Sequence, residues 1–332
     1  MKYFYYFFGD LLILFKILIK KNYKICFFNE NKFTLKYLEH YIKKKRSRKI
    51  ILITFEDLSE NFANTDIYHL KTNFFRQLVF LTLDVKLVYS STPGLNQTIF
   101  RRSILNKNIK YIYIQHSPVS LTKAYYENSF NNFDYLQSIN IFQTREIKLI
   151  NSKYNLKIKD VKTKYYFLNN KKKNIHKKKI LIAPTWGTDF YEMNFLMELL
   201  YSLKKENLNF IFRPHYMSLK RKEFNPENFK NLYSNFDYSP NLNLNDYSDL
   251  ISDWSGIYME FCLTKNRKCF LINTKQKILN NKVFSDHLTI EEKLRSKLSY
   301  IYEKNNIHNM VNKIKNEKTI ESVNHITKNF FY

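Results

Sequence analysis

Residues 250–261 read LISDWSGIYMEF. The apolar start predicts a buried strand, and Ser255 and Gly256 open a helix that is expected over 257–264. A buried strand that runs through a polar turn into a helix is the repeating unit of an α/β fold with a parallel sheet. Ligands of such sheets bind at the carboxyl ends of the strands, so this turn is where chemistry is expected.

The same alternation of strand and helix runs through the rest of the chain. In the first half it predicts a helix at 34–45 and strands at 24–28, 49–54, 86–90, 111–115 and 140–144. In the second half it predicts strands at 179–183, 209–212 and 269–273, a helix at 190–204 and a helical, Lys-rich end. These two series predict an α/β protein with two Rossmann-like lobes.

The length of 332 residues also fits about two domains. Residues 169–179 read NNKKKNIHKKK, which is dense in charge, offers nothing to bury and is typical of a linker. We therefore predict an N-terminal helix over 1–22, a first lobe over 23–168, this linker, and a second lobe over 180–332.

The first nineteen residues, MKYFYYFFGDLLILFKILI, are apolar and aromatic but are interrupted by Gly9, Asp10 and Lys16. A membrane-spanning helix needs about 20 predominantly apolar residues, so a span is disfavoured. A secretion signal is also disfavoured, because a basic start and a small-residue cleavage site are missing. Aromatic residues with a basic flank fit a helix that lies at a membrane surface, and a helix docked on the first lobe fits equally.

The formal charge of +26 invites a nucleic-acid interpretation, but most of the 55 basic residues are Lys. Arg is the side chain preferred for paired phosphate and base contacts, and no zinc-finger or single-strand-binding motif is present. The joint excess of Lys, Asn, Ile, Phe and Tyr is what an AT-rich genome produces in any protein. We expect no nucleic-acid partner, although a basic surface favours other anions.

Cofactor and metal motifs are missing as well. With four glycines the chain has no Gly-x-Gly-x-x-Gly and no Walker A sequence, and two of the four, Gly187 and Gly256, fall in strand-end turns. No His-x-x-x-His pair or carboxylate cluster suggests a metal. Cys26, Cys262 and Cys269 lack Cys-x-x-Cys spacing and are expected to be buried thiols in a reducing cytosol. We therefore expect neither cofactor nor metal.

Within the turn of residues 252–256, Ser252, Asp253 and Ser255 are good helix-capping residues. The free N–H groups and the dipole of a helix N-terminus favour an anion such as phosphate. Glu260 follows near the end of the second helical turn, where its carboxylate is expected to reach a ribose hydroxyl. Ordinary capping without a ligand is the alternative interpretation.

Two histidines also follow predicted strands. Pro214 stiffens the strand exit at Arg213-Pro214-His215, where Arg suits a diphosphate and His can bond it or titrate. His116, in Gln115-His116-Ser117-Pro118, follows an apolar strand of the first lobe and has the placement of a general base. For each histidine taken alone, a structural role is the alternative.

Together these turns resemble those of the CDP-glycerol glycerophosphotransferase family, which makes teichoic-acid-like polymers. The family has a His-Gly turn, an Ala-Pro-Thr-Trp strand end, an Arg-Pro-His-Pro-like turn, and a Thr/Ser-Asp-Tyr-Ser-Ser turn followed by an acidic-aromatic pair. Here they stand as His116-Ser117, Ala183-Pro184-Thr185-Trp186, Arg213-Pro214-His215-Tyr216 and Ser252-Asp253-Trp254-Ser255-Gly256, with Glu260-Phe261 behind. Ser117 replaces the family's Gly, Tyr216 its second Pro and Gly256 its last Ser. The resemblance covers roughly residues 110–275.

The resemblance implies a GT-B-like fold, with a cleft between two Rossmann-like lobes, and metal-independent transfer of an alditol phosphate from a CDP-linked donor. The acceptor would be a hydroxyl of a cell-surface polysaccharide, a teichoic-acid-like polymer or a lipid-linked chain, at the cytoplasmic face of the cell membrane. His116 would be the general base, and His215 would hold the donor diphosphate. The donor site would also include Arg213, Thr185, Ser252, Asp253, Ser255, Gly256 and Glu260.

Two alternatives remain at the level of sequence. One is a GT-B glycosyltransferase that uses a nucleotide sugar, so that the glycosidic bond is the one broken. The other is a basic, non-enzymatic protein that binds an anionic polymer. Such a binder needs charge but not ordered polar turns at strand ends.

Overall fold

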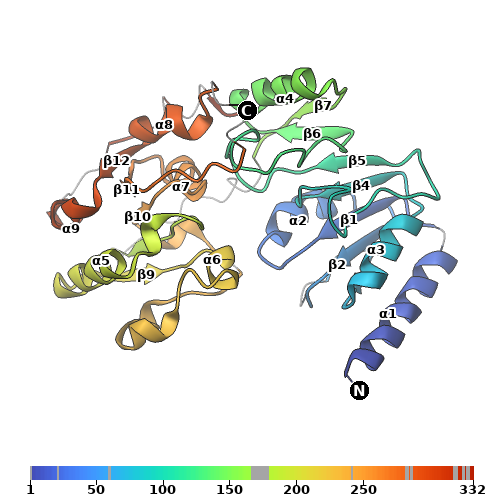
Figure 1. The fold of residues 1–332 in the computed structure, drawn as a ribbon, viewed down its shortest axis with the longest axis horizontal. Helices are drawn as coiled ribbons and strands as arrows, with labels where there is room; N and C mark the ends of the chain where they lie inside the picture. Colours follow the sequence, from blue (N-terminus) through green and yellow to red (C-terminus); the bar gives the residue numbers. More distant parts are fainter. Residues whose placement is uncertain are drawn as a thin grey trace. The chain divides into compact units, whose positions relative to one another are not determined.

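The computed structural model describes residues 2–20, 22–58, 61–165, 179–240, 242–280, 284, 287–316, 321–323, 326 and 330–332. The chain divides into two compact units, and Figure 1 labels most of their helices and strands. Unit 1 comprises Met1–His116, Tyr126–Phe167 and Tyr332, and unit 2 comprises Ser117–Tyr125 and Leu168–Phe331. The predicted linker at 169–179 lies outside the described residues, apart from Lys179.

Unit 1 is built on a parallel sheet with the strand order β3-β2-β1-β4-β5-β6-β7. Its elements are α1 (Lys2–Ile19), β1 (Ile25–Asn29), α2 (Leu35–Lys44), β2 (Ile50–Thr54), β3 (Thr65–His69), α3 (Asn73–Thr82), β4 (Leu87–Ser90), β5 (Lys110–Tyr113), β6 (Tyr135–Ser138), α4 (Ile141–Tyr154) and β7 (Lys159–Lys162). The strand order reverses between β1 and β4, as in a dinucleotide-binding fold.

The central strands explain why the sheet is covered by helices. All residues of β1 and β2 are buried, which is typical of parallel strands packed on both faces. Helix α2 buries Leu35, Leu38 and Ile42, spaced at three and four residues, and these join the same core cluster as the strands. The predicted strands at 24–28, 49–54, 86–90 and 111–115 and the helix at 34–45 are confirmed within about two residues.

The predicted strand at 140–144 is wrong. The strand of this region is β6, which ends at Ser138, and α4 begins at Ile141. Asn140 caps that helix, because its side chain accepts a hydrogen bond from the Gln143 N–H at 2.9 Å. The apolar residues that suggested a strand are instead the buried face of α4.

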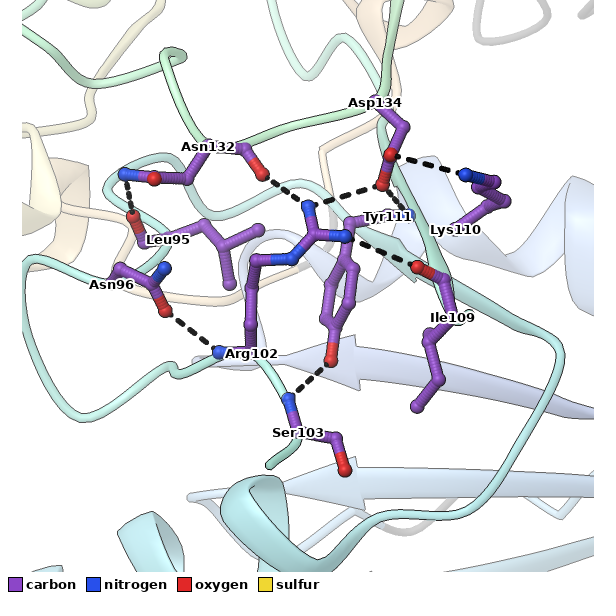
Figure 2. A network of polar contacts seen from close by, with 9 residues as sticks. All are labelled: Leu95, Asn96, Arg102, Ser103, Ile109, Lys110, Tyr111, Asn132 and Asp134. Carbon is purple, nitrogen blue, oxygen red and sulfur yellow. Dashed lines mark hydrogen bonds and ion pairs between the residues drawn. The ribbon is translucent and has the colours of Figure 1, made fainter. Parts of the chain in front are cut away.

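A polar network fixes the amino ends of β5 and β6 (Figure 2). Arg102 donates to the carbonyls of Asn132 at 2.7 Å and Ile109 at 3.2 Å. Its guanidinium also pairs with Asp134 at 3.1 Å and lies 4.5 Å from the centre of the Tyr111 ring. Because this network ties loops to the end of the sheet opposite to the carboxyl ends of the strands, its role is structural.

Helix α1 is docked on unit 1 by its inner face and runs beside α3 (Figure 1). Asp10 is buried and accepts hydrogen bonds from the N–H groups of Lys71 and Thr72 just before α3. Leu14 and Ile17 are buried on the same face. The polar residue that interrupts the apolar sequence is therefore what anchors the helix.

Unit 2 is built on a parallel sheet with the strand order β12-β11-β10-β8-β9. Its α-helices and strands are β8 (Ile180–Ile182), α5 (Met193–Lys205), β9 (Phe210–Phe212), α6 (Tyr216–Lys220), β10 (Asp249–Ser252), α7 (Ile257–Lys265), β11 (Cys269–Ile272), α8 (Ile290–Leu298), β12 (Ser299–Tyr302) and α9 (Ile307–Asn316). Short 3₁₀ helices are η2 (Asp189–Tyr191), η3 (Pro226–Asn235), η4 (Leu244–Asp246) and η5 (Lys304–Asn306). Each strand and helix predicted for this half is present, and β12 is an addition.

The segment 117–125 belongs to unit 2, although it lies between β5 and β6 of unit 1 in the sequence. The Ser120 N–H donates to the Glu291 carboxylate at 2.9 Å, and the Lys123 carbonyl accepts from the Leu279 N–H at 2.8 Å. Lys123 also pairs with Glu292. The chain therefore passes between the units at Ser117 and Tyr126 as well as near residue 168, which a single linker does not anticipate.

Candidate functional site

The two most informative turns meet where the strand order of unit 2 reverses. β8 is followed by Pro184-Thr185-Trp186, and its neighbour β10 leads into Ser252-Asp253. In open α/β sheets the chain leaves two such neighbouring strands in opposite directions, which opens a ligand crevice at their carboxyl ends. The predicted donor residues of these turns thus come together at the place where the fold expects a ligand.

Asp253 connects the two turns at this strand-order reversal. It is fully buried, and its carboxylate accepts from the Thr185 N–H at 2.8 Å, the Thr188 hydroxyl at 2.8 Å and the Ser255 N–H at 3.3 Å. Burial raises the pKa of Asp253, while these donors act in the opposite direction. Asp253 therefore joins the β8 turn to the β10 turn.

The N-terminus of α7 closes the β10 turn. Among the described residues, no acceptor is hydrogen-bonded to the N–H groups of Gly256 and Ile257. A Cβ atom on Gly256 would lie 2.1 Å from the Ser117 Oγ and 2.8 Å from the Val119 Cγ1. Glycine is thus required at 256 because the segment 117–125 passes against the start of this helix.

His215 lies at the carboxyl end of β9, where it caps α6. Its Nδ1 accepts from the Met217 N–H at 3.1 Å, so in the neutral imidazole the proton is on Nε2. Its own N–H donates to the Tyr191 hydroxyl at 3.0 Å. The turn therefore fixes both the position and the tautomer of a ring that can donate a hydrogen bond through Nε2.

Arg213 is already engaged within unit 2. Its guanidinium pairs with Asp237 and donates to the Ser239 carbonyl, and the side chain is mostly buried. The Asp237 pairing neutralises its charge and holds the strand exit from which His215 projects. A direct contact between Arg213 and the donor stays a prediction.

Other predicted donor residues differ in what they can offer. Ser252 is buried and donates to the Ala183 carbonyl at 2.6 Å, so its hydroxyl holds β10 to β8. Glu260 is buried on α7. The hydroxyls of Thr185 and Ser255 are engaged in no hydrogen bond with other described residues. These two hydroxyls, together with the N–H groups of α7, are the groups in this turn that remain available to a ligand.

A cation that the sequence reasoning missed lies beside the β8 turn. The Lys277 ammonium lies 3.6 Å from the centre of the Trp186 ring, and Arg221 lies 5.0 Å from the same ring. Burial lowers the pKa of Lys277 to about 8. Lys277 forms no ion pair with any described carboxylate. The only sequence signal for it was its position in the loop after a strand.

In unit 1, His116 follows β5 and is largely enclosed. Its Nδ1 lies 3.0 Å from the Tyr113 hydroxyl, and the Tyr37 ring lies 6.1 Å away, centre to centre. Burial lowers the pKa of His116 to about 4, although a hydrogen bond with the Ser91 backbone acts to raise it. The imidazole is therefore neutral at physiological pH, which is the form a general base needs.

The wall teichoic acid polymerase TagF superimposes with a TM-score of 0.59 at 16% identity, over 93% of this chain and 88% of that one. A protein from Listeria monocytogenes assigned as a UDP-N-acetylglucosamine 2-epimerase superimposes with a TM-score of 0.50 at 9% identity, over 89% and 88%. No protein-family model and no curated protein sequence matches the chain.

The fold is GT-B-like, with two Rossmann-like lobes. The strand orders of the two units carry this conclusion together with the structural likeness, which at such identities concerns the fold alone. In the described part of the chain, no three His, Cys, Asp or Glu side chains gather as a metal site would require. Cys26, Cys262 and Cys269 are buried free thiols.

Proposed function

We propose that the chain is a transferase that binds a nucleotide-linked donor through its phosphates in unit 2 and passes an alditol phosphate to an acceptor hydroxyl. The observation that carries the proposal is the pair of polar turns at the strand-order reversal of unit 2, which Asp253 holds together beside the α7 N-terminus. The available groups there are N–H donors, hydroxyls and one cation, and these are the groups that bind phosphate.

We assign each residue a role in this proposal, guided by the family resemblance and by its contacts. The α7 N–H groups and the hydroxyls of Thr185 and Ser255 bind phosphate oxygens. His215 donates through Nε2 to the diphosphate and offsets charge as the nucleoside monophosphate leaves. Lys277 supplies positive charge beside the same turn. His116 accepts the proton of the acceptor hydroxyl.

The family resemblance favours a CDP-linked alditol as the donor, and the likeness to a wall teichoic acid polymerase is consistent with an acceptor of the cell surface. A nucleotide sugar is the second candidate, because groups that recognise phosphate serve either donor. The likeness to a protein assigned as a UDP-N-acetylglucosamine 2-epimerase is a reason to test nucleotide sugars as donors.

Incubation of the purified chain with CDP-glycerol, CDP-ribitol and a series of UDP-, GDP- and CDP-sugars tests the proposal. We expect release of CMP from a CDP-alditol, read by chromatography, and loss of that release in His215→Ala. Release of a nucleoside diphosphate would instead establish a glycosyltransferase. Salt-sensitive polymer binding without any nucleotide release would support the non-enzymatic alternative.

Contact with a membrane is a further part of this proposal, and α1 carries it. Its outer face exposes Tyr3, Phe4, Leu12 and Phe15, while Asp10 and its neighbours anchor the inner face. An amphipathic helix with exposed aromatic and aliphatic side chains binds at the interface of an anionic bilayer. No helix of the described residues is long and apolar enough to cross a bilayer.

We expect the triple substitution Phe4→Ser, Leu12→Ser and Phe15→Ser to weaken sedimentation with anionic vesicles by at least about tenfold, since each buried apolar side chain contributes about 1.5–3 kcal/mol. A deletion of α1 is the poorer test, because it would also remove the buried Asp10 anchor. The matched control is Ile104→Ser with Tyr126→Ser, two exposed apolar residues elsewhere in unit 1. Equal loss in both variants would refute the assignment.

A further inference from the structure

Unit 1 contains a hollow of about 360 Å³, its open mouth included, at the carboxyl ends of its last strands. One wall is the face of α2 that carries Lys36, Tyr37, His40 and Tyr41. The remaining wall consists of residues at or just beyond the carboxyl ends of β5, β6 and β7, namely Gln115, Gln137, Ile139, Lys164 and Tyr165. Its place at strand ends is where an α/β sheet binds ligands, and none of its lining residues belongs to the turns of unit 2 that are proposed to bind phosphate.

A buried amide among the lining residues of this hollow has an unused acceptor. Gln115 is 2% exposed, and its Nε2 donates to the Gln137 carbonyl at 2.8 Å. That bond fixes the orientation of the amide, because only the nitrogen can donate to a carbonyl. The Oε1 atom is buried and accepts no hydrogen bond. A buried acceptor without a donor is unfavourable by about 1–3 kcal/mol, so a ligand hydroxyl that donates to it would be recognised.

The rest of the lining selects for charge and shape. Lys36 and Lys164 come from different elements, and none of the described residues that line the hollow carries a carboxylate. Lys164 is exposed and forms no ion pair within the described part of the chain. The Tyr37 and Tyr165 rings are stacked at 6.4 Å, and the Tyr41 hydroxyl donates to the Gln137 Oε1 at 2.9 Å. Two cations with phenol walls favour an anion attached to a hydroxylated, ring-sized or shorter group.

We propose that this hollow binds one anionic sugar or polyol unit, with a ligand hydroxyl donating to Gln115 and the phosphate or carboxylate held by Lys36 and Lys164. The proposed binding does not depend on the transferase proposal. Only the assignment of the bound sugar or polyol as the acceptor of the reaction rests on the proposed function. Tyr37 links the hollow to His116, because its ring contacts Tyr165 in the hollow and also the His116 ring. The bound unit would therefore lie in the same lobe as the proposed general base and close to it.

Titration calorimetry of the full chain with sn-glycerol 3-phosphate, glucuronate, glycerol and inorganic phosphate tests the proposal. We expect the tighter-binding of the two anionic polyols to bind at least about tenfold more tightly than either glycerol or phosphate. Only an anionic polyol offers both a hydroxyl for Gln115 and an anion for the two lysines. The comparison between glycerol 3-phosphate and glucuronate identifies whether the anion is a phosphate or a carboxylate. Phosphate binding as tightly as both anionic polyols would overturn the proposal.

Variants locate the ligand. Lys164→Gln is expected to weaken binding of the preferred polyol by about three- to tenfold, and Gln115→Leu to weaken the polyol but not inorganic phosphate. Lys162→Gln, an exposed lysine two residues away that does not line the hollow, is the matched control. If His215→Ala weakens binding and Lys164→Gln does not, the ligand lies in unit 2 and the proposal is wrong.

The same preparations separate this inference from the proposed function. Binding lost in Lys164→Gln but without release of any nucleotide would support the hollow and refute the transferase. Nucleotide release from a donor without binding of any anionic polyol would support the transferase and refute the hollow.

Discussion

Replacement of His116 by Gln is expected to lower the kcat of the transferase by about 10²–10⁴-fold, which is the usual contribution of a positioned general base. Gln retains polar atoms near the Tyr113 hydroxyl but cannot accept a proton. The measurement is CMP release from the donor that the panel identifies, at saturating donor and acceptor. His308→Gln, a change at an exposed histidine of α9, is the matched control and is expected to leave kcat unchanged.

The pH profile separates a catalytic from a structural His116. Because burial lowers the pKa of His116 to about 4, its proton-accepting form persists down to that pH. We expect kcat/KM to lose its His116-dependent part only as the pH falls through about 4. An acid limb near the ordinary histidine value of 6.5 that disappears in His116→Gln would contradict the enclosed geometry.

The same low pKa has a consequence for stability. The folded state resists protonation of His116, so stability that is present above pH 6.5 is lost as the pH falls from about 6.5 towards 4. For a shift of this size the loss is at most about 3 kcal/mol, and His116→Gln should flatten the pH dependence of unfolding over that interval.

Replacement of Gly256 by Ser is expected to destabilise unit 2 by about 1–3 kcal/mol, the usual effect of an extra group in a well-packed site. The added Cβ would overlap the Ser117 Oγ at 2.1 Å and press on Val119 at 2.8 Å. The measurement is the free energy of unfolding in urea. Gly9→Ser, on the exposed side of α1 where a Cβ meets nothing within 4 Å, is the matched control and is expected to change stability by less than about 0.5 kcal/mol.

A second substitution should rescue this variant. The glycerophosphotransferase family that this chain resembles has Gly at the position of Ser117 and Ser at the position of Gly256. The single serine side chain is therefore at position 117 in this chain and at the position of 256 in the family. The structure brings these positions together. We therefore expect Ser117→Gly to recover at least about 1 kcal/mol in the Gly256→Ser background, measured as a double-mutant cycle. Strict additivity of the two changes would show that the positions do not compensate.

Much of the fold could be predicted because its central strands are unbroken apolar runs. Strands β1, β2, β8 and β11 are buried along their whole length. Such continuous apolar runs can be recognised as strands in a single sequence. The edge strands β3 and β7 were missed, because an edge strand mixes charged and apolar residues and loses that signal. The first residues of α4 were predicted as a strand because Asn140 was not recognised as a helix cap.

The candidate site was predicted in part for the same reason. Turns that follow buried strands were found, and in unit 2 they converge on Asp253. Lys277 could not be found, since a lysine in a loop of a Lys-rich chain carries no pattern. The role of Gln115 could not be predicted from the sequence either. Its unused acceptor depends on a tertiary hydrogen bond to the Gln137 carbonyl.

The assignment of the segment 117–125 to unit 2 has a consequence for how the protein can be taken apart. A clone that begins after residue 168 would lack nine residues that its own core uses, including Ser120 and Lys123. A clone that ends near residue 165 would carry those residues without the surface they pack on. Neither lobe is therefore a self-contained gene fragment. Recombination between relatives at the lobe boundary would have to preserve the match between this insert and the α7 N-terminus, which ties the two halves together in evolution.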